Sequence, residues 1–127
     1  MTQREGPVLI VDDDLDIRET LTEILEDRGF DVITAANGLE ALDLLRSAEA
    51  APFVILLDLM MPIMDGYGFL EEYARAPALA TIPVLVVTAG HRVDRSRLGG
   101  APIVPKPIDV PRLVNLLSDL RSAAGVS

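Results

Sequence analysis

Short apolar runs alternate along the chain with stretches in which apolar residues recur every three or four positions. The runs are rich in Val, Ile and Leu and span residues 8–11, 31–35, 53–57, 84–87 and 103–104. Such runs are typical of strands that are buried on both faces. Helical spacing follows the first, second, third and fifth runs, with apolar residues at 17, 21, 24 and 25, at 39, 42 and 45, at 69, 70 and 73, and at 113, 116, 117 and 120. This alternation predicts an α/β domain with a parallel sheet covered by helices on both faces.

Polar residues stand where several of the predicted strands end. Ligands of open parallel sheets bind beyond the carboxyl ends of the strands, so these residues are expected to converge on one edge. They are Asp12, Asp13 and Asp14 after the first strand, Asp58 after the third, Thr88 after the fourth and Lys106 after the fifth.

The convergent residues predict phosphoryl chemistry with a metal ion. Carboxylates held together repel each other, and a hard divalent cation is the simplest way to balance them. The chain has no cysteine and one histidine, so oxygen ligands favour Mg²⁺, with Mn²⁺ as an alternative, over zinc. A metal beside a hydroxyl and an ammonium group can stabilise a phosphoryl group. Asp58, at the end of the predicted central strand, is best placed to be the nucleophile that forms an aspartyl-phosphate.

Length, hydrophobic content and net charge argue against a membrane protein and a nucleic-acid-binding protein. The 127 residues, half of them hydrophobic, predict one domain over 1–127. No apolar run reaches the ~18 residues that span a bilayer, and the start of the chain lacks the apolar core of a secretory signal. The net charge of −9 argues against nucleic-acid binding. We expect a cytoplasmic protein with neither a membrane nor a nucleic-acid partner.

Four motifs together resemble the receiver domain of two-component response regulators. They are VLIVDDD (8–14), ILLDLMMPIMDG (55–66), VLVVTA (84–89) and PKP (105–107). The resemblance covers an ordered core of about residues 6–122. It implies a flavodoxin-like (βα)5 fold, doubly wound, with a parallel five-stranded sheet in the order 2-1-3-4-5.

The resemblance also assigns roles to the residues at the sheet edge. Asp58 resembles the phosphoacceptor, and Asp12 and Asp13 resemble the acidic pair that holds Mg²⁺, with Asp13 as the direct ligand. Asp58 itself and the backbone carbonyl of Met60 would complete the protein ligands.

Two further residues complete the expected catalytic set with Asp58. Thr88 resembles the switch hydroxyl that moves to the phosphoryl group. Lys106 resembles the lysine that pairs with acceptor or phosphoryl oxygens, and its bond to Pro107 is expected to be cis. Gly90, two positions past Thr88, would leave the attacking water unshielded, so we expect a short-lived phosphoryl group.

The chain departs from the family pattern between the fourth and fifth strands. The switch aromatic of the family, three residues before the motif lysine, is replaced by Ile103. Residues 90–101 are polar and glycine-rich, with Val93 and Leu98 as the apolar anchors, so we expect a shortened or missing fourth helix. Arginines 92, 95 and 97 in this segment would form a basic face that contacts an acidic partner or the phosphoryl site, and His91 is expected to be exposed.

A calcium-binding EF-hand loop is the first alternative. Asp12, Asp14, Asp16 and Glu23 occupy loop positions one, three, five and twelve. Position six is Ile17, where the sharp turn of that loop requires glycine, and the acidic run follows a strand. We reject this interpretation.

Two other classes fit less well than a working receiver. A haloacid-dehalogenase-like phosphatase would use Asp12 as nucleophile and Asp14 as acid, but it leaves the 58–66 motif unexplained. A receiver-like adaptor that binds partners without being phosphorylated is the main alternative. We expect a stand-alone response regulator, similar to single-domain chemotaxis regulators, and not a metabolic enzyme. Its partners would be a sensor histidine kinase or histidine phosphotransfer protein and an unknown downstream protein, with a homodimer of the chain as an alternative.

Overall fold

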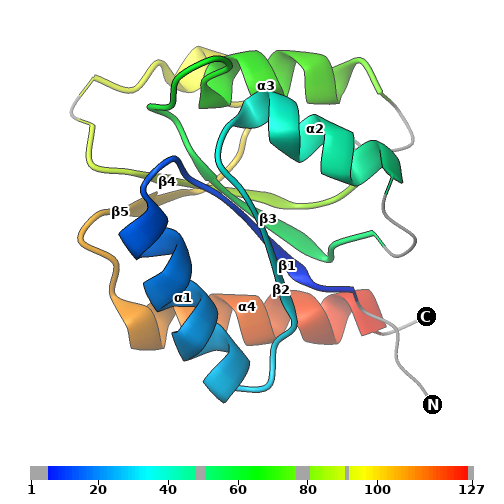
Figure 1. Ribbon diagram of the computed structural model, residues 1–127, viewed down its shortest axis with the longest axis vertical. Coiled ribbons are helices and arrows are strands. Elements are labelled where there is room, and N and C mark those ends of the chain that lie inside the picture. The colour runs from blue at the N-terminus through cyan, green and yellow to red at the C-terminus, as the bar shows by residue number, and fades with distance from the viewer. Residues whose placement is uncertain (1–5, 48–50, 77–80, 91, 126–127) are drawn as a thin grey trace.

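Five strands and four α-helices make up the fold in the part of the chain that the computed structural model describes, residues 6–47, 51–76, 81–90 and 92–125 (Figure 1). The strands are β1 (Val8–Val11), β2 (Val32–Ala35), β3 (Val54–Asp58), β4 (Val84–Thr88) and β5 (Ile103–Pro105). The helices are α1 (Leu15–Asp27), α2 (Gly38–Ser47), α3 (Gly66–Ala74) and α4 (Val110–Gly125), and a short 3-10 turn, η1 (Arg95–Arg97), lies between β4 and β5.

The strands form one parallel sheet in the order β2-β1-β3-β4-β5, which confirms the predicted topology. Val11 of β1 lies opposite Ala35 of β2 and Leu57 of β3, so β1 and β2 end at the same level and β3 ends one residue further on. Residues that follow the strands therefore share one edge of the sheet.

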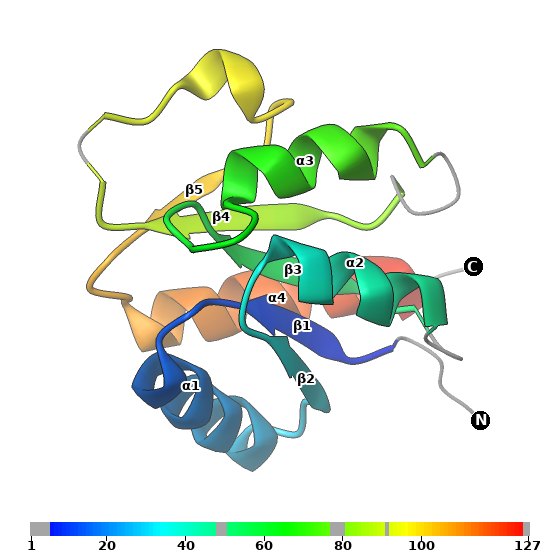
Figure 2. The ribbon, with the colours of Figure 1, turned by 45° about the horizontal axis from the view of Figure 1, so that its top comes forward.

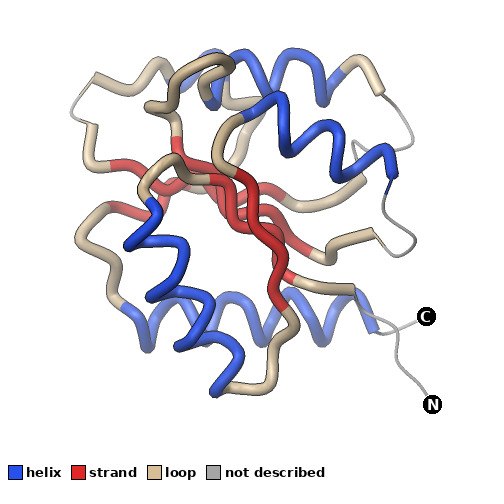
Figure 3. The backbone as a smooth tube through the Cα atoms, viewed as in Figure 1, coloured by secondary structure: helices blue, strands red, loops and turns tan. Residues whose placement is uncertain are grey.

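Helices cover both faces of the sheet, with α2 and α3 on one side and α1 and α4 on the other (Figures 1, 2 and 3). Alternate residues of each strand point to opposite faces, as the pleat requires. In β1, Leu9 and Val11 pack under α2 and α3, whereas Val8 and Ile10 pack against α1 and α4. This two-sided burial explains why the strands are continuous apolar runs.

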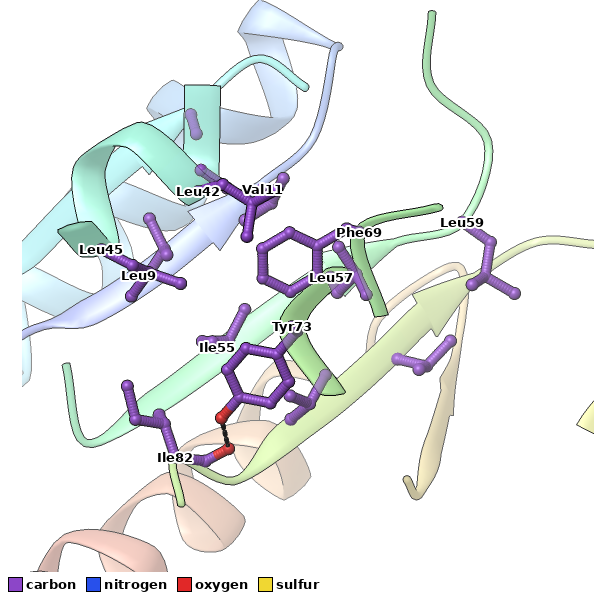
Figure 4. Packing of buried hydrophobic residues seen from close by; sticks show 14 of the residues in the cluster. Leu9, Val11, Leu42, Leu45, Ile55, Leu57, Leu59, Phe69, Tyr73 and Ile82 are labelled. Atoms are coloured by element: carbon purple, nitrogen blue, oxygen red, sulfur yellow. Dashed lines mark hydrogen bonds between the residues drawn. The ribbon is translucent and has the colours of Figure 1, made fainter. Parts of the chain in front are cut away.

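Aromatic side chains fill the core beneath α3 (Figure 4). Phe69 is fully buried and stacks on Tyr73 at a centroid distance of 5.6 Å. The Tyr73 hydroxyl donates a hydrogen bond to the Ile82 carbonyl, which ties the end of α3 to the segment before β4. Burial raises the pKa of the Tyr73 phenol above 10.0.

The segment between β4 and β5 contains one 3-10 turn and no α-helix within its described residues, which confirms the prediction of a missing fourth helix. Two consecutive glycines, Gly99 and Gly100, adopt positive φ angles of 62° and 84° and end the turn. Leu98 is buried and Val93 packs against the same core cluster. The two predicted anchors therefore hold the segment to the sheet, while His91 lies outside the described residues.

Arg97, one of the three arginines of this segment, contacts α3. The Arg97 guanidinium lies 4.5 Å from the centroid of the Tyr67 ring and forms an ion pair with Glu71 at 3.1 Å. The Tyr67 hydroxyl accepts a hydrogen bond from the Asp94 N–H at 2.9 Å. Arg97 thus binds α3 of its own chain.

The helix ends follow local sequence signals, with one difference from expectation. Asp14 caps α1 by accepting hydrogen bonds from the N–H groups of Asp16 and Ile17. Asp109 accepts one from the N–H of Arg112 at the start of α4. This helix continues to Gly125, beyond the expected end of the ordered core at residue 122, and its alanines favour that extension.

Among the described residues, the helices are too short or too polar to span a membrane.

Candidate metal and phosphoryl site

Three carboxylates meet at the carboxyl edge of the sheet. Asp12 and Asp13 follow β1 and Asp58 ends the neighbouring strand β3, and one oxygen of each lies within 4.8 Å of the others. Asp12 and Asp58 are 4% and 7% exposed, whereas Asp13 is exposed to solvent. The site therefore has a buried floor and one carboxylate at its mouth.

Asp12 is held by partners on both carboxylate oxygens. Its Oδ1 accepts a hydrogen bond from the Asp14 N–H at 2.9 Å, and its Oδ2 accepts one from the Lys106 Nζ at 3.0 Å. The charge-assisted bond to Lys106 compensates for the burial of a charged group.

Asp58 carries a raised pKa. Burial is the largest cause, and the neighbouring Asp12 charge raises the pKa further. The Lys106 ammonium, 3.8 Å from Asp58 Oδ2, and a hydrogen bond from the Met60 N–H at 3.3 Å act in the opposite direction, while Asp13 adds a smaller rise. Negative charge on Asp58 is thus destabilised by its surroundings.

The ends of β4 and β5 bring Thr88 and Lys106 to the same edge. The Lys106 N–H donates to the Thr88 carbonyl at 3.0 Å, which sets the level of the two strand ends. Thr88 is buried, and its Oγ1 accepts a hydrogen bond from the Gly90 N–H at 3.0 Å. The peptide bond from Lys106 to Pro107 is cis, as predicted.

Ile103 lies deeper in the sheet than Thr88. It pairs with Val86, whereas Thr88 pairs with Pro105, so Ile103 is two residues inward from the edge on the adjacent strand. It is partly buried and packs with the core cluster under α2 and α3. By the alternation of the pleat, Thr88 and Ile103 belong to the same face of the sheet.

The loop after Asp58 makes a tight turn that depends on Gly66. A Cβ on Gly66 would lie 2.6 Å from the Asp58 carbonyl oxygen and 2.7 Å from Leu59 Cα, so a side chain cannot fit there. Asp65 caps α3 by accepting a hydrogen bond from the Gly68 N–H at 2.8 Å. In the same loop Ile63 has a φ of 68° and is 79% exposed.

The donor set fits a hard divalent cation. Three carboxylates face one ammonium group, which leaves an excess of negative charge that a divalent cation would balance. The donors of the cluster are all oxygens, which suits Mg²⁺ better than zinc. Asp12, Asp13 and Asp58 could hold the ion. The backbone N–H of Met60 bonds to Asp58, and its side chain is 70% exposed.

One residue beside the site was missed by the sequence argument. The Arg18 Nη1 donates a hydrogen bond to the backbone carbonyl of Asp12 at 2.8 Å. The available signal was spacing, because residue 18 lies one helical turn past the Asp14 cap and α1 starts directly beside the acidic run.

A family model described as the response regulator receiver domain matches residues 8–118. The transcriptional regulatory protein CpxR homolog of Haemophilus influenzae is 38% identical over 125 residues, which cover 94% of this chain and 52% of that protein. The response regulator Rre1 of a Synechocystis species is 35% identical over 118 residues, covering 89% of this chain and 50% of that protein. The chain thus spans about half the length of these curated relatives.

Solved structures agree in fold. A signal receiver domain of a signal transduction histidine kinase from Syntrophus aciditrophicus has a TM-score of 0.85 and 33% identity, covering 96% of this chain and 94% of that one. The chemotaxis protein CheY4 of Vibrio cholerae has a TM-score of 0.79 and 29% identity, covering 92% and 99%. Sequence and fold together show that this chain belongs to the receiver domain family of response regulators.

Proposed function

We propose that this receiver domain accepts a phosphoryl group on Asp58 in an Mg²⁺-dependent reaction and relays a signal by binding other proteins. The observation that carries the proposal is the position of Asp58, which shares a site with Asp12 and Asp13 and has Lys106 at 3.8 Å. Carboxylates and an ammonium group around one buried acid match the requirements of phosphoryl transfer better than those of a structural ion pair.

The reaction would form an acyl phosphate. A carboxylate oxygen of Asp58 attacks the phosphorus atom of the donor, and the bond from phosphorus to the donor nitrogen or oxygen breaks. The electron pair of that bond stays with the donor, which takes up a proton from solvent. Mg²⁺ held by Asp12, Asp13 and Asp58 would neutralise charge on the phosphoryl oxygens. The Lys106 ammonium would do the same from the β5 side of the site.

The phosphoryl group would act on Thr88. The Thr88 oxygen accepts from the Gly90 N–H, so its own proton can be donated to a phosphoryl oxygen. A shift of this hydroxyl would alter the bond to Gly90 and the segment that follows it. Ile103 occupies the position of the family aromatic, so any coupling runs through the β4–β5 segment without a change of aromatic rotamer.

The donor would be a sensor histidine kinase or a histidine phosphotransfer protein, and the output would be a contact with a downstream protein or a second copy of the chain. Phosphorylation adds charge and strong acceptor oxygens, which is enough to change such a contact. The acidic half of the chain, residues 1–72 with a net charge of −13, argues for partners other than nucleic acid. The stand-alone arrangement stays a prediction.

The proposal is tested by intact-protein mass spectrometry after incubation with acetyl phosphate, with Mg²⁺ or with EDTA. We expect one phosphoryl adduct that needs Mg²⁺ and is lost in Asp58→Asn. Asp65→Asn is the matched control, because it removes an acid from the same loop and keeps a good helix cap. A folded protein that forms no adduct, and also fails to bind beryllofluoride, would favour the unphosphorylated adaptor.

A further inference from the structure

We propose that Arg18 is a positioning residue for the Mg²⁺ site, because its guanidinium fixes the peptide that joins Asp12 to Asp13. The inference rests on the proposed function only in taking the three carboxylates as an Mg²⁺ site. It concerns a residue of α1 that lies outside the carboxylate cluster.

Arg18 donates two hydrogen bonds to backbone carbonyls of the acidic segment 12–14. Its Nη1 donates to the Asp12 carbonyl at 2.8 Å, and its backbone N–H donates to the Asp14 carbonyl at 3.0 Å. The second bond belongs to the first turn of α1, so the side chain is anchored on a regular helix. Arg18 is partly buried, and its planar guanidinium presents its N–H donors in a fixed arrangement toward the Asp12 carbonyl.

The bond acts chiefly on Asp13. Asp12 already has its carboxylate fixed by Lys106 and by the Asp14 N–H. Asp13 is exposed, so the direction of its carboxylate depends on the orientation of the preceding peptide. The Asp12 carbonyl belongs to that peptide, and Arg18 holds the carbonyl. Loss of the bond would let the peptide rotate and move Asp13 away from the other two carboxylates.

Charge and geometry predict opposite results for removal of Arg18. A guanidinium beside a cation site repels the cation, so its removal would tighten Mg²⁺ binding if charge were its only effect. If Arg18 positions Asp13, its removal weakens binding despite the lost repulsion. Loss of an outer-shell partner typically costs about 10–100-fold in metal affinity. The geometric effect is therefore expected to dominate.

The test is an Mg²⁺ titration of the full chain followed by backbone amide NMR shifts, with thermal unfolding in EDTA measured in parallel. We expect Arg18→Met to weaken Mg²⁺ binding by about tenfold. Arg18→Lys keeps the charge and one donor and should recover part of the loss. Because this variant is the milder change, it also carries the test if Arg18→Met does not fold.

Arg121→Met is the matched control. Arg121 makes the same kind of contact away from the acidic site, with its Nη1 on the Gly29 carbonyl at 3.1 Å and its guanidinium 4.1 Å from the Phe30 ring centroid. This variant should lower the melting temperature and leave the Mg²⁺ affinity unchanged.

Two results would overturn the inference. Unchanged affinity in a less stable Arg18→Met would show a purely structural role, and tighter binding would show an effect of charge alone. A wild-type chain that shows no Mg²⁺-dependent shifts would instead contradict the metal site of the proposed function. The wild-type titration therefore separates the two failures.

Discussion

Lys106 donates a hydrogen bond to Asp12 at 3.0 Å, across 94 residues of sequence. The two side chains are 18% and 5% exposed, so the pair is largely removed from water. The bond joins the end of β5 to the end of β1 across β3 and β4. It also leaves the Lys106 ammonium within 3.8 Å of Asp58, close to where a phosphoryl oxygen would lie.

Replacement of Lys106 by Met is expected to lower stability and to tighten Mg²⁺ binding. Asp12 would lose its charged partner while remaining buried, which costs about 3–5 kcal/mol of unfolding free energy in EDTA. The variant would also lack the Lys106 ammonium, which competes with Mg²⁺ for the carboxylates of Asp12 and Asp58. Urea unfolding and an Mg²⁺ titration measure the two effects.

Arg75→Met is the control for this change. The ion pair of Arg75 with Glu72 is exposed on α3, and such pairs contribute about 0–1 kcal/mol. Its Mg²⁺ affinity should equal that of the wild type. If Lys106→Met binds Mg²⁺ no more tightly than this control, then the ammonium does not compete with the cation as the geometry indicates.

Asp58→Asn is expected to stabilise the metal-free protein at neutral pH. The pKa of Asp58 is raised above 3.8, so folding disfavours the ionised form, mainly through burial and secondly through Asp12. The wild type therefore loses stability as pH rises from 3.8 through the folded-state pKa, and the neutral amide avoids that loss. Urea unfolding in EDTA should show a gain at pH 7 that disappears at acidic pH. A gain that persists unchanged below pH 3.8 would point to a cause other than charge.

Ile63→Asn is expected to stabilise the domain by about 1 kcal/mol, because a β-branched residue at positive φ is strained and asparagine tolerates that region. Ile63 has a φ of 68° and is 79% exposed, so little packing is lost. Leu116→Asn, an exposed apolar residue of α4, has no such strain and should show no gain. A drop in the melting temperature of Ile63→Asn would mean that the left-handed conformation is not a source of strain.

Tyr67→Phe is expected to loosen the segment between β4 and β5. The variant removes the acceptor of the Asp94 N–H, a bond with a net value of about 0.5–1.5 kcal/mol, and keeps the ring under Arg97. Hydrogen exchange should accelerate at residues 94–98 and stay unchanged in the sheet. Tyr73→Phe, which loses the bond to Ile82, should instead lower global stability. Unaltered exchange at 94–98 in Tyr67→Phe would show that the hydroxyl does not hold this segment.

The sheet and the acidic cluster could be predicted because each depends on a local pattern and one general rule. Runs such as 53–57 are apolar throughout because both faces of the sheet are covered. Asp12 and Asp58 converge because neighbouring parallel strands end at one edge of the sheet. The absence of an α-helix from the described residues between β4 and β5 could also be predicted from the sequence, because Gly99 and Gly100 stand where a helix would continue.

Other features required the fold itself. The bond from Arg18 to the Asp12 carbonyl depends on how α1 leaves the sheet, and the contact of Tyr67 with Asp94 joins residues 27 apart. The apolar pattern of α4 ends at Leu120, whereas the helix reaches Gly125 through residues that carry no amphipathic signal. Long-range contacts and helix ends are set by tertiary packing, which hydrophobic periodicity does not encode.

The role of Asp58 is tested most simply by locating the phosphoryl group on the protein. The protein is incubated with acetyl phosphate and Mg²⁺, reduced with borohydride, which converts a phosphorylated aspartate to homoserine, and mapped by peptide mass spectrometry. We expect homoserine at position 58 and nowhere else, and none when EDTA replaces Mg²⁺. Homoserine at Asp12 or Asp13 with residue 58 intact, or at position 58 in EDTA, would contradict this expectation.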